Sequence, residues 1–186
     1  MIILASKSPR RKEILENLGF EYRCVPAETD ETPVEGMSPA DTVMLFSQRK
    51  AFAVKDEAGN GDVVLGMDTM VCIDGELLGK PRDEEDAFRM LKMLSGRKHN
   101  VITGYTVICG NKWESGCVST DVYFRPLTDS EIRWYISTNE PMDKAGSYGI
   151  QGKGSLFVES VDGDFFSVIG FPVCTVFKVV KKLKNS

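Results

Sequence analysis

The sequence contains only one histidine, His99, and this scarcity excludes a metal centre built from several imidazoles. Its five cysteines are an odd number and include no Cys-x-x-Cys pair. Most of them have apolar or β-branched neighbours, so we expect small buried side chains in a reducing compartment and neither a disulfide framework nor a zinc site. If a metal ion binds, we expect oxygen ligands, which Mg²⁺ and Mn²⁺ prefer.

Long apolar runs are also missing from the chain. No stretch approaches the ~20 apolar residues that a membrane-spanning helix needs. The first apolar run ends at Ala5, where charged residues follow, and this pattern is not that of a secretory signal. We therefore expect a soluble, cytoplasmic protein with no membrane partner.

Two common nucleotide-binding signatures are absent as well. Neither G-x-x-x-x-G-K-[ST] nor G-x-G-x-x-G occurs, which excludes a P-loop and a typical Rossmann protein. The net charge of −4 over 186 residues argues against a general binder of nucleic-acid polymers. The 42% hydrophobic and 27% charged residues are ordinary for a globular protein, and we expect one domain over residues 1–186, in two lobes.

Positive charge is concentrated near the start of the chain. Ile2 to Ala5 predicts a buried strand, and Ser8 followed by Pro9 predicts the start of a helix. Arg10 and Arg11 fall in the first turn of that helix, where the helix dipole is already positive. Backbone N–H groups, serine hydroxyls and two guanidinium groups at one point are typical of a phosphate site. The alternative is that both arginines extend into solvent.

An acidic residue interrupts the most apolar strand that the sequence predicts. Nearly all residues from Val63 to Ile73 are apolar, which predicts a strand buried on both faces. Asp68 in its middle is costly to bury unless it is paired, bound to a metal or open to a cleft. Gly66 indicates a bulge or the close approach of another element. We interpret Asp68 as a functional residue; the alternative is an aspartate that caps a neighbouring loop.

The remaining chain alternates predicted strands and helices. A hairpin turn at Asp74-Gly75 returns the chain toward Lys80, which we expect to face the same cleft as Asp68. A second hairpin is expected from Leu156 to Ile169. We interpret His99, which precedes a strand, as a structural residue.

A glycine-rich segment lies between Pro141 and Gly154, with four glycines in nine residues. It predicts a loop whose exposed N–H groups bring the backbone against a ligand. An arginine-bearing helix start, a buried acid, scattered lysines and such a loop together suit hydrolysis of a phosphoanhydride. Cations and N–H groups would neutralise phosphate oxygens, and a carboxylate would hold Mg²⁺ or activate water.

Five segments, in order along the chain, resemble the motifs of the Maf family of nucleoside triphosphate pyrophosphatases, first named as septum formation inhibitors. They are Ser6-x-Ser8-Pro9-Arg10-Arg11, Gly66-Met67-Asp68-Thr69, Gly79-Lys80-Pro81, Ser95-Gly96-x-x-His99 and Asp143-Lys144-Ala145-Gly146-x-Tyr148-Gly149-Ile150-Gln151-Gly152. The resemblance implies an α/β protein with an inosine-triphosphatase-like fold, in which helices flank a long, twisted mixed sheet and two lobes surround a central cleft. It also implies hydrolysis between the α and β phosphates, with a divalent metal cation (Mg²⁺ or Mn²⁺), to a nucleoside monophosphate and pyrophosphate.

The resemblance also implies roles for particular residues. Asp68 would be the proton acceptor or metal-linked base, with Glu31 near the metal. The phosphates would be held by Ser6, Arg10, Arg11, Lys50 and Lys80. The last motif resembles the branch that acts on dTTP and UTP, whose specificity positions are matched by Arg10, Thr69 and Gln151. The Gln151 amide offers a donor and an acceptor to a pyrimidine edge.

One residue departs from the family pattern. Met67 stands where the family usually has alanine, and because side chains alternate along a strand we expect it to point away from Asp68.

Two other functions stay open at this point. One is a nucleotide-binding regulator of cell division, although a carboxylate beside a triphosphate repels it unless a metal or water intervenes. The other is a pyrophosphatase for modified nucleotides with broad base tolerance. Removal of unwanted nucleotides from cellular pools would suit either enzyme, and a homodimer is compatible with the resemblance.

Overall fold

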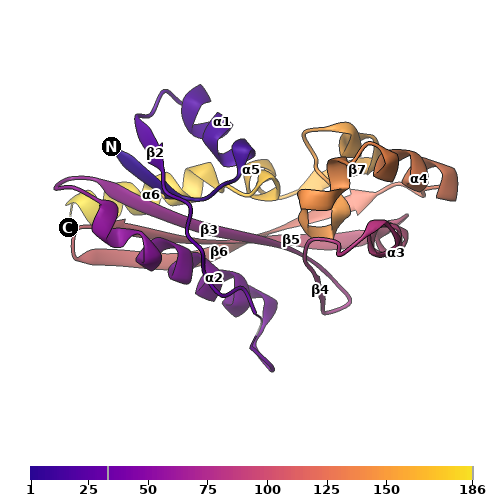
Figure 1. The fold of residues 1–186 in the computed structure, drawn as a ribbon, viewed down its shortest axis with the longest axis horizontal. Coiled ribbons are helices and arrows are strands. Elements are labelled where there is room, and N and C mark those ends of the chain that lie inside the picture. The colour runs from indigo at the N-terminus through magenta and orange to yellow at the C-terminus, as the bar shows by residue number, and fades with distance from the viewer. Residues whose placement is uncertain (33, 186) are drawn as a thin grey trace. The chain divides into compact units, whose positions relative to one another are not determined.

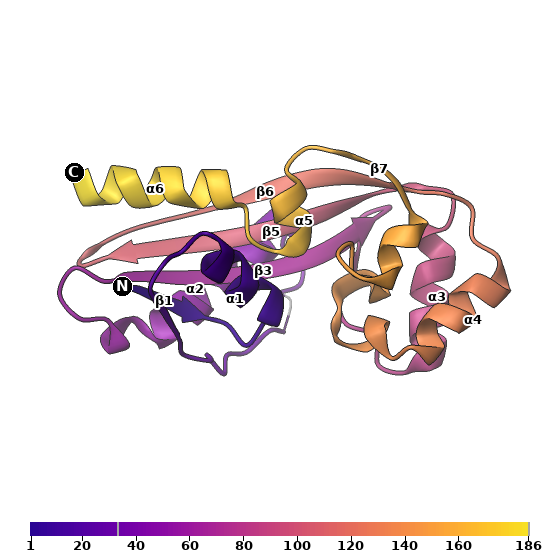
Figure 2. The ribbon, with the colours of Figure 1, turned by 90° about the horizontal axis from the view of Figure 1, so that it is seen from above.

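A computed structural model describes residues 1–32 and 34–185 of the chain (Figures 1 and 2). Its strands are β1 (Ile2–Ala5), β2 (Tyr22–Cys24), β3 (Val63–Ile73), β4 (Glu76–Leu78), β5 (Lys98–Cys109), β6 (Lys112–Phe124) and β7 (Val158–Asp162). Its α-helices are α1 (Pro9–Asn17), α2 (Pro39–Ala53), α3 (Glu84–Leu94), α4 (Asp129–Ser137), α5 (Phe165–Ile169) and α6 (Val173–Asn185). Short 3₁₀ helices are η1 (Lys55–Glu57), η2 (Glu140–Asp143), η3 (Ala145–Ser147) and η4 (Lys153–Phe157). Within the described part, no helix combines the length and the apolar character needed to cross a membrane.

The strands form one seven-stranded sheet in the order β2-β1-β3-β5-β6-β7, and β4 pairs with β3. β1 runs parallel to both β2 and β3, whereas β4 is antiparallel to β3 and β7 is antiparallel to β6. The predicted α/β class with a mixed sheet and flanking helices is confirmed.

The chain divides into two compact units. The first consists of Met1–Asp68, Thr103–Val118 and Gly170–Ser186, and the second of Thr69–Ile102 and Ser119–Ile169. The longest strands, β3, β5 and β6, contribute residues to both units. The expected single domain and the central cleft stay predictions.

In the first unit, two glycines allow α2 to lie directly on the sheet. A Cβ atom added to Gly66 on β3 would lie 2.3 Å from the carbonyl oxygen of Ser47, and one added to Gly104 on β5 would lie 2.2 Å from that of Val43. Only glycine tolerates such an approach of a helix backbone. The close approach predicted at Gly66 is confirmed, and it fixes where α2 sits along β3.

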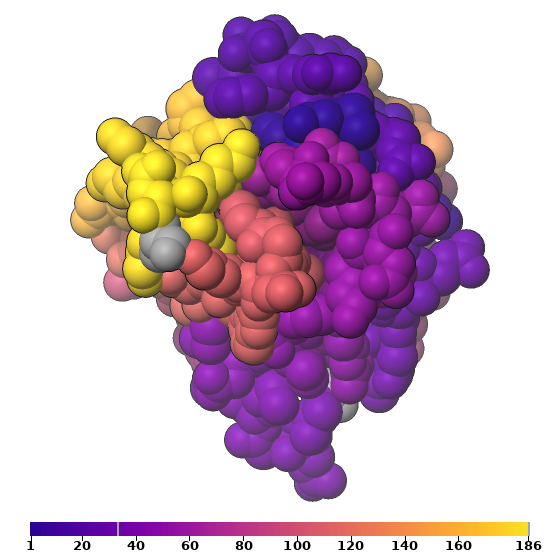
Figure 3. Space-filling model, turned by 90° about the vertical axis from the view of Figure 1, so that its left-hand side faces the viewer, coloured from indigo at the N-terminus to yellow at the C-terminus, as the bar shows by residue number. Residues whose placement is uncertain are grey.

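The last helix of the first unit, α6, packs through apolar side chains. Val176, Val179 and Leu183 are buried, while Lys182 forms a 2.5 Å ion pair with Glu114 on β6. Figure 2 shows α6 alongside the first part of β6, and Figure 3 shows it beside the turn that joins β5 to β6. The spacing of the buried residues is that of an amphipathic helix.

The second unit has its own apolar core, in which α3 and α4 pack together with the buried side chains of β5 and β6. His99 is 1% exposed, its Nε2 atom lies 2.8 Å from the Tyr148 hydroxyl, and its ring contacts Phe124 edge-on. Burial lowers the pKa of His99 to about 4. This neutral, enclosed environment agrees with a structural role for His99.

The second predicted hairpin is wrong in its second half. β7 forms, but Phe165–Ile169 is the helix α5 rather than a strand. The Asp164 carboxylate accepts hydrogen bonds from the backbone N–H groups of Phe166 and Ser167, at 2.8 and 3.2 Å, and so caps the helix. The aromatic and β-branched composition predicts a strand, but this cap satisfies the first amides of a helix instead.

Candidate active site

The start of α1 directs Arg11 into the first unit rather than into solvent. Arg11 is 9% exposed, and its Nε donates to the carbonyl of Gly170 at 2.8 Å. Its Nη1 donates to Ser6 Oγ at 3.0 Å and to the carbonyl of Met67 at 3.1 Å. Ser6 Oγ also accepts from the Ser8 backbone N–H at 3.1 Å. The alternative that both arginines extend into solvent is wrong for Arg11.

The charge of Arg11 is buried away from water, which is unfavourable for a guanidinium ion. Burial and, to a smaller extent, the charge of Arg10 lower the pKa of its guanidinium, and the carboxylates of Asp68 and Glu31 oppose the shift; the net pKa is about 10. The guanidinium therefore stays protonated at neutral pH. Arg10, half-buried in the same helical turn, adds a second positive charge, so an anion that binds near this turn is stabilised.

The close approach of α2 to β3 brings Lys50 to Asp68. Lys50 Nζ lies 2.5 Å from Asp68 Oδ1 and 2.8 Å from Glu31 Oε1, so one ammonium group joins two carboxylates. The side chains of Lys50 and Asp68 are only 12% and 10% exposed. The sequence alone leaves the direction of Lys50 open, and the structure directs it inward.

The second carboxylate oxygen of Asp68 has no hydrogen bond. Asp68 Oδ2 is buried, and none of the residues in 1–32 and 34–185 supplies it with a partner. Burying a charged oxygen without a partner is costly, so such an atom marks a place where a ligand, a metal ion or water binds. This feature separates Asp68 from a merely structural acid.

The acidic segment Glu28-Thr29-Asp30-Glu31-Thr32, which precedes α2, contacts that helix at two points. Glu31, 49% exposed, pairs with Lys50, and the carbonyl of Asp30 accepts a 2.7 Å hydrogen bond from Arg49. Most of this segment is exposed, but Glu31 reaches Lys50, the partner of Asp68. Lys50 thus joins Glu31 to Asp68, while Arg11 binds Ser6 and the carbonyl of Met67, the residue before Asp68. We call the side chains of Ser6, Arg11, Glu31, Lys50 and Asp68 the Asp68 cluster.

The other predicted site residues belong to the second unit. Thr69 follows Asp68 on β3 and is partly exposed, Lys80 is exposed just after β4, and Gln151 is exposed in the glycine-rich segment. That these three side chains face the Asp68 cluster stays a prediction.

The glycine amides of the second unit are not available to a ligand in the way the sequence predicts. Gly146 N–H donates to the carbonyl of Gly79 at 3.0 Å, Gly149 N–H to the Tyr135 hydroxyl at 3.1 Å, and Gly154 N–H to Glu140 Oε1 at 3.2 Å. Gly152 N–H donates to the carbonyl of Gly149 at 3.4 Å. The expectation of exposed N–H groups is therefore wrong for all four glycines, because side chains outside the segment supply two of the acceptors and backbone carbonyls supply the other two.

Two partners of the site have no signature in the sequence. The carbonyls of Met67 and Gly170 accept hydrogen bonds from Arg11, and every residue type offers such a carbonyl. Met67, which departs from the family pattern, has a fully buried side chain.

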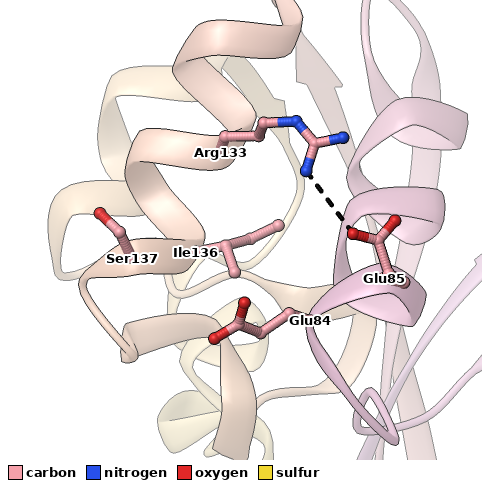
Figure 4. A pocket seen from close by; sticks show the side chains of 5 residues that line it. All are labelled: Glu84, Glu85, Arg133, Ile136 and Ser137. Carbon is pink, nitrogen blue, oxygen red and sulfur yellow. Dashed lines mark ion pairs between the residues drawn. The ribbon is translucent and has the colours of Figure 1, made fainter.

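A surface pocket of the second unit contains none of the predicted site residues (Figure 4). It is lined by Glu84, Glu85, Arg133, Ile136 and Ser137 on α3 and α4. Its one guanidinium already pairs with Glu85 at 3.5 Å and packs over the ring of Phe88, and two carboxylates repel a phosphate. We assign no nucleotide chemistry to this pocket.

The fold and the Asp68 cluster define an α/β protein with a candidate site for phosphate groups. The chain belongs to the family of Maf-like proteins, whose sequence model matches residues 1–183.

Named relatives are similar over nearly their whole length. A protein of Bacillus velezensis is 49% identical over 97% of this chain and 95% of its own, and one of Thermococcus onnurineus is 49% identical over 96% of each. One of Clostridioides difficile is 47% identical over 97% of this chain and 94% of its own. Each carries the name dTTP/UTP pyrophosphatase.

One solved structure is alike to a lesser degree. The nucleoside-triphosphatase / dITP/XTP pyrophosphatase of Mycobacterium abscessus is 16% identical, with a TM-score of 0.40 over 68% of this chain and 74% of that protein. This likeness is too slight to assign a fold or a function.

Proposed function

We propose that this protein hydrolyses the α–β phosphoanhydride of dTTP and UTP, giving the nucleoside monophosphate and pyrophosphate. Membership of the Maf-like family and the names of relatives at 47–49% identity support the reaction and its substrates. The observation that carries the proposal is the Asp68 carboxylate, which pairs with Lys50 through one oxygen, while its other oxygen is buried and has no partner among the described residues.

In this proposal Asp68 accepts the proton of the attacking water. An ionised carboxylate oxygen without a hydrogen bond is able to take that proton, and general-base catalysis of this kind contributes about 10²–10⁴-fold. Arg11 is held in place by three acceptors, so its charge is fixed before substrate arrives, which is the preorganisation that stabilises charge on phosphoryl oxygens.

The other residues bind the triphosphate and the base. Ser6, Arg10, Lys50 and Lys80 hold phosphate oxygens with Arg11. Lys50 exchanges part of its pairing with Glu31 and Asp68 for a phosphate when substrate binds, because a triphosphate carries more negative charge than either carboxylate. Thr69 and Gln151 contact the pyrimidine.

The donor set around Asp68 fits a divalent cation that is shared with substrate. Among the described residues no group of three or more His, Cys, Asp or Glu side chains is arranged to hold a metal ion. Mg²⁺, however, is usually held by one or two carboxylates together with substrate phosphates. Glu31 and Asp68 Oδ1, which Lys50 releases in part when substrate binds, would supply that number and leave Asp68 Oδ2 for the proton. When bound there, the ion would neutralise charge on the phosphate oxygens. A cytoplasmic location and a homodimer stay predictions.

The proposal is tested by identifying the products from a panel of nucleotides. Purified protein with Mg²⁺ is incubated with dTTP, UTP, CTP, dGTP, 7-methyl-GTP and ITP, and the products are separated by anion exchange. We expect monophosphate and pyrophosphate, with dTTP and UTP preferred. Orthophosphate would mean cleavage between the β and γ phosphates. Preference for 7-methyl-GTP or ITP would indicate a pyrophosphatase for modified nucleotides, and nucleotide binding without turnover would favour a regulator of cell division.

A further inference from the structure

Glu140, the first residue of η2, receives three hydrogen bonds on its carboxylate. Oε1 accepts from the Tyr135 hydroxyl at 2.9 Å and from the Gly154 N–H at 3.2 Å, and Oε2 accepts from the Lys153 N–H at 3.0 Å. All these residues lie in the second unit. One carboxylate therefore anchors the C-terminal end of the segment 149–154.

Tyr135 extends this anchor to the other end of the segment. Its side chain on α4 is fully buried. Its hydroxyl oxygen accepts a 3.1 Å hydrogen bond from the Gly149 N–H, and its O–H group donates a hydrogen bond to Glu140. Gln151, which is exposed, lies between these attachment points. The backbone on both sides of Gln151 is thus tied to one pair of side chains.

The Glu140 and Tyr135 side chains leave no room for a side chain at two glycines of the segment. A Cβ atom at Gly152 would lie 2.4 Å from Glu140 Oε1, and one at Gly154 would lie 2.7 Å from the Tyr135 hydroxyl. Contacts below 3.0 Å force the neighbouring atoms to move, so a side chain at either position would displace Glu140 or Tyr135. The glycine pattern that suggests ligand contact is explained at these two positions by contact with the anchor.

The anchor is charged. Burial raises the pKa of the Glu140 carboxyl, but the hydrogen bonds from Lys153, Gly154 and Tyr135 and the charge of Lys144 outweigh it, so the pKa lies below its usual value. Lys144 Nζ also donates to the Glu140 carbonyl at 2.7 Å. Hydrogen bonds to an ionised acceptor are about twice as strong as neutral ones, which makes the carboxylate a firm support.

We propose that Glu140 is a positioning residue for base recognition: its carboxylate holds the segment 149–154 so that Gln151 presents its amide to the pyrimidine. This inference rests on the proposed function, because it takes Gln151 as the residue that reads the base. A supporting group of this kind fixes a binding residue that stands on a loop.

The test compares Glu140→Gln with a matched control, Glu131→Gln. In Glu140→Gln one oxygen remains for Tyr135 and Gly154, but an NH₂ group faces the Lys153 N–H, where neither group can accept. Glu131 likewise accepts a 2.8 Å backbone hydrogen bond, from Thr128 at the start of α4, and among residues 1–32 and 34–185 the other partner of its carboxylate is Arg125, outside the segment. Both variants lose a carboxylate that accepts a hydrogen bond from a backbone N–H group.

We expect the two variants to differ in selectivity. Glu140→Gln raises KM for UTP about tenfold and changes kcat/KM for ATP much less, since one charge-assisted contact corresponds to a factor of this size. Glu131→Gln keeps the UTP/ATP ratio of kcat/KM within about twofold of the wild type. An unchanged ratio in Glu140→Gln, while the wild type discriminates, overturns the inference and leaves the proposed function standing.

A double-mutant cycle tests whether Glu140 acts through Gln151. If it does, Glu140→Gln adds little to the loss of selectivity already present in Gln151→Ala. Selectivity losses that multiply show that Glu140 acts by another route and contradict the inference.

Amide hydrogen exchange gives a readout that does not depend on activity. We expect faster exchange at Lys153 and Gly154 in Glu140→Gln and unchanged exchange there in Glu131→Gln. Unchanged exchange in both variants rules out the anchor.

If Glu140→Gln does not fold, the same measurements are made on Tyr135→Phe, which keeps the ring in the core and removes only the hydroxyl. Wild-type protein that hydrolyses neither UTP nor dTTP overturns the proposed function and base recognition, while the exchange data still decide whether Glu140 holds the segment.

Discussion

Lys50 Nζ and Asp68 Oδ1 lie 2.5 Å apart on α2 and β3, with side chains only 12% and 10% exposed. Lys92 and Asp129 form an ion pair of the same 2.5 Å length on the surface, with side chains 52% and 64% exposed. The two pairs have the same separation and differ in burial. Breaking a buried pair leaves an uncompensated charge, whereas solvent replaces the lost partner at the surface.

This difference predicts unequal costs of removing the two lysines. Lys50→Met is expected to lower the free energy of unfolding by about 3 kcal/mol, because the Asp68 charge stays buried without its ammonium partner. Lys92→Met is expected to lower it by less than about 1 kcal/mol. Urea denaturation measures both. Adding Asp68→Asn to Lys50→Met should recover part of the loss, and equal costs for the two lysine variants would show that burial does not govern this pair.

Removal of Arg10 is expected to weaken binding of the triphosphate. Arg10→Ala takes away one cation from the first turn of α1, beside the buried Arg11, and should raise the Kd for UTP about tenfold. Lys12→Ala, in the same helix but outside the motif, serves as the control and should change Kd by less than about twofold. Isothermal titration calorimetry gives both constants. Unchanged affinity in Arg10→Ala removes this residue from the site.

The burial of His99 predicts a loss of stability in acid. Its pKa falls from 6.5 to about 4 on folding because burial disfavours the charged ring, so the unfolded chain binds the proton more tightly. The neutral His99 ring therefore contributes fully to the free energy of unfolding above pH 6.5. This contribution is lost as the pH falls toward 4, and the total loss is about 3 kcal/mol at 1.36 kcal/mol per pKa unit.

The His99 contribution is measured by denaturation at several pH values between 4 and 7. His99→Gln has no titrating ring and is expected to flatten the curve in this window, whatever its stability at neutral pH. A slope that is the same in wild type and variant would assign the acid sensitivity to other groups.

Glu31 is expected to affect the metal requirement more than the reaction itself. Chelation of divalent cations should abolish turnover, and Glu31→Gln should raise the Mg²⁺ concentration for half-maximal activity several-fold by removing one carboxylate beside Asp68. Asp30→Asn, the preceding acid in the same segment, is the control and should leave that concentration nearly unchanged. Full activity in chelator would refute the proposed metal.

The sequence predicts the parts of the fold and site that depend on local chemistry. The apolar composition of β3 predicts its burial on both faces, and burial in turn makes Asp68 stand out. Gly66 predicts the close approach that α2 makes. The direction of Lys50 is not predictable in this way, because α2 carries polar residues on several sides and the Asp68 partner lies on another element.

Two predictions from the sequence are wrong for different reasons. Phe165–Ile169 has the composition of a strand, yet the Asp164 cap makes it helical. The glycine amides suggest a ligand site, yet Tyr135 and Glu140, which both precede the glycine-rich segment, accept hydrogen bonds from two of those glycines. The cap is a local signal, because Asp164 directly precedes the helix. The acceptors of Tyr135 and Glu140 are brought to the glycines only by the folded chain.

The most direct test of the account is the activity of Asp68→Asn. The substitution keeps the shape of the side chain and its place on β3 while removing the charge and the proton-accepting oxygen. Asp56→Asn, an exposed acid in η1, is the control. We predict that Asp68→Asn folds, binds UTP with Kd within about tenfold of wild type, and forms UMP and pyrophosphate at least about 100-fold more slowly, while the control stays at the wild-type rate. Hydrolysis by Asp68→Asn at the wild-type rate would contradict the assignment of Asp68 as the catalytic base.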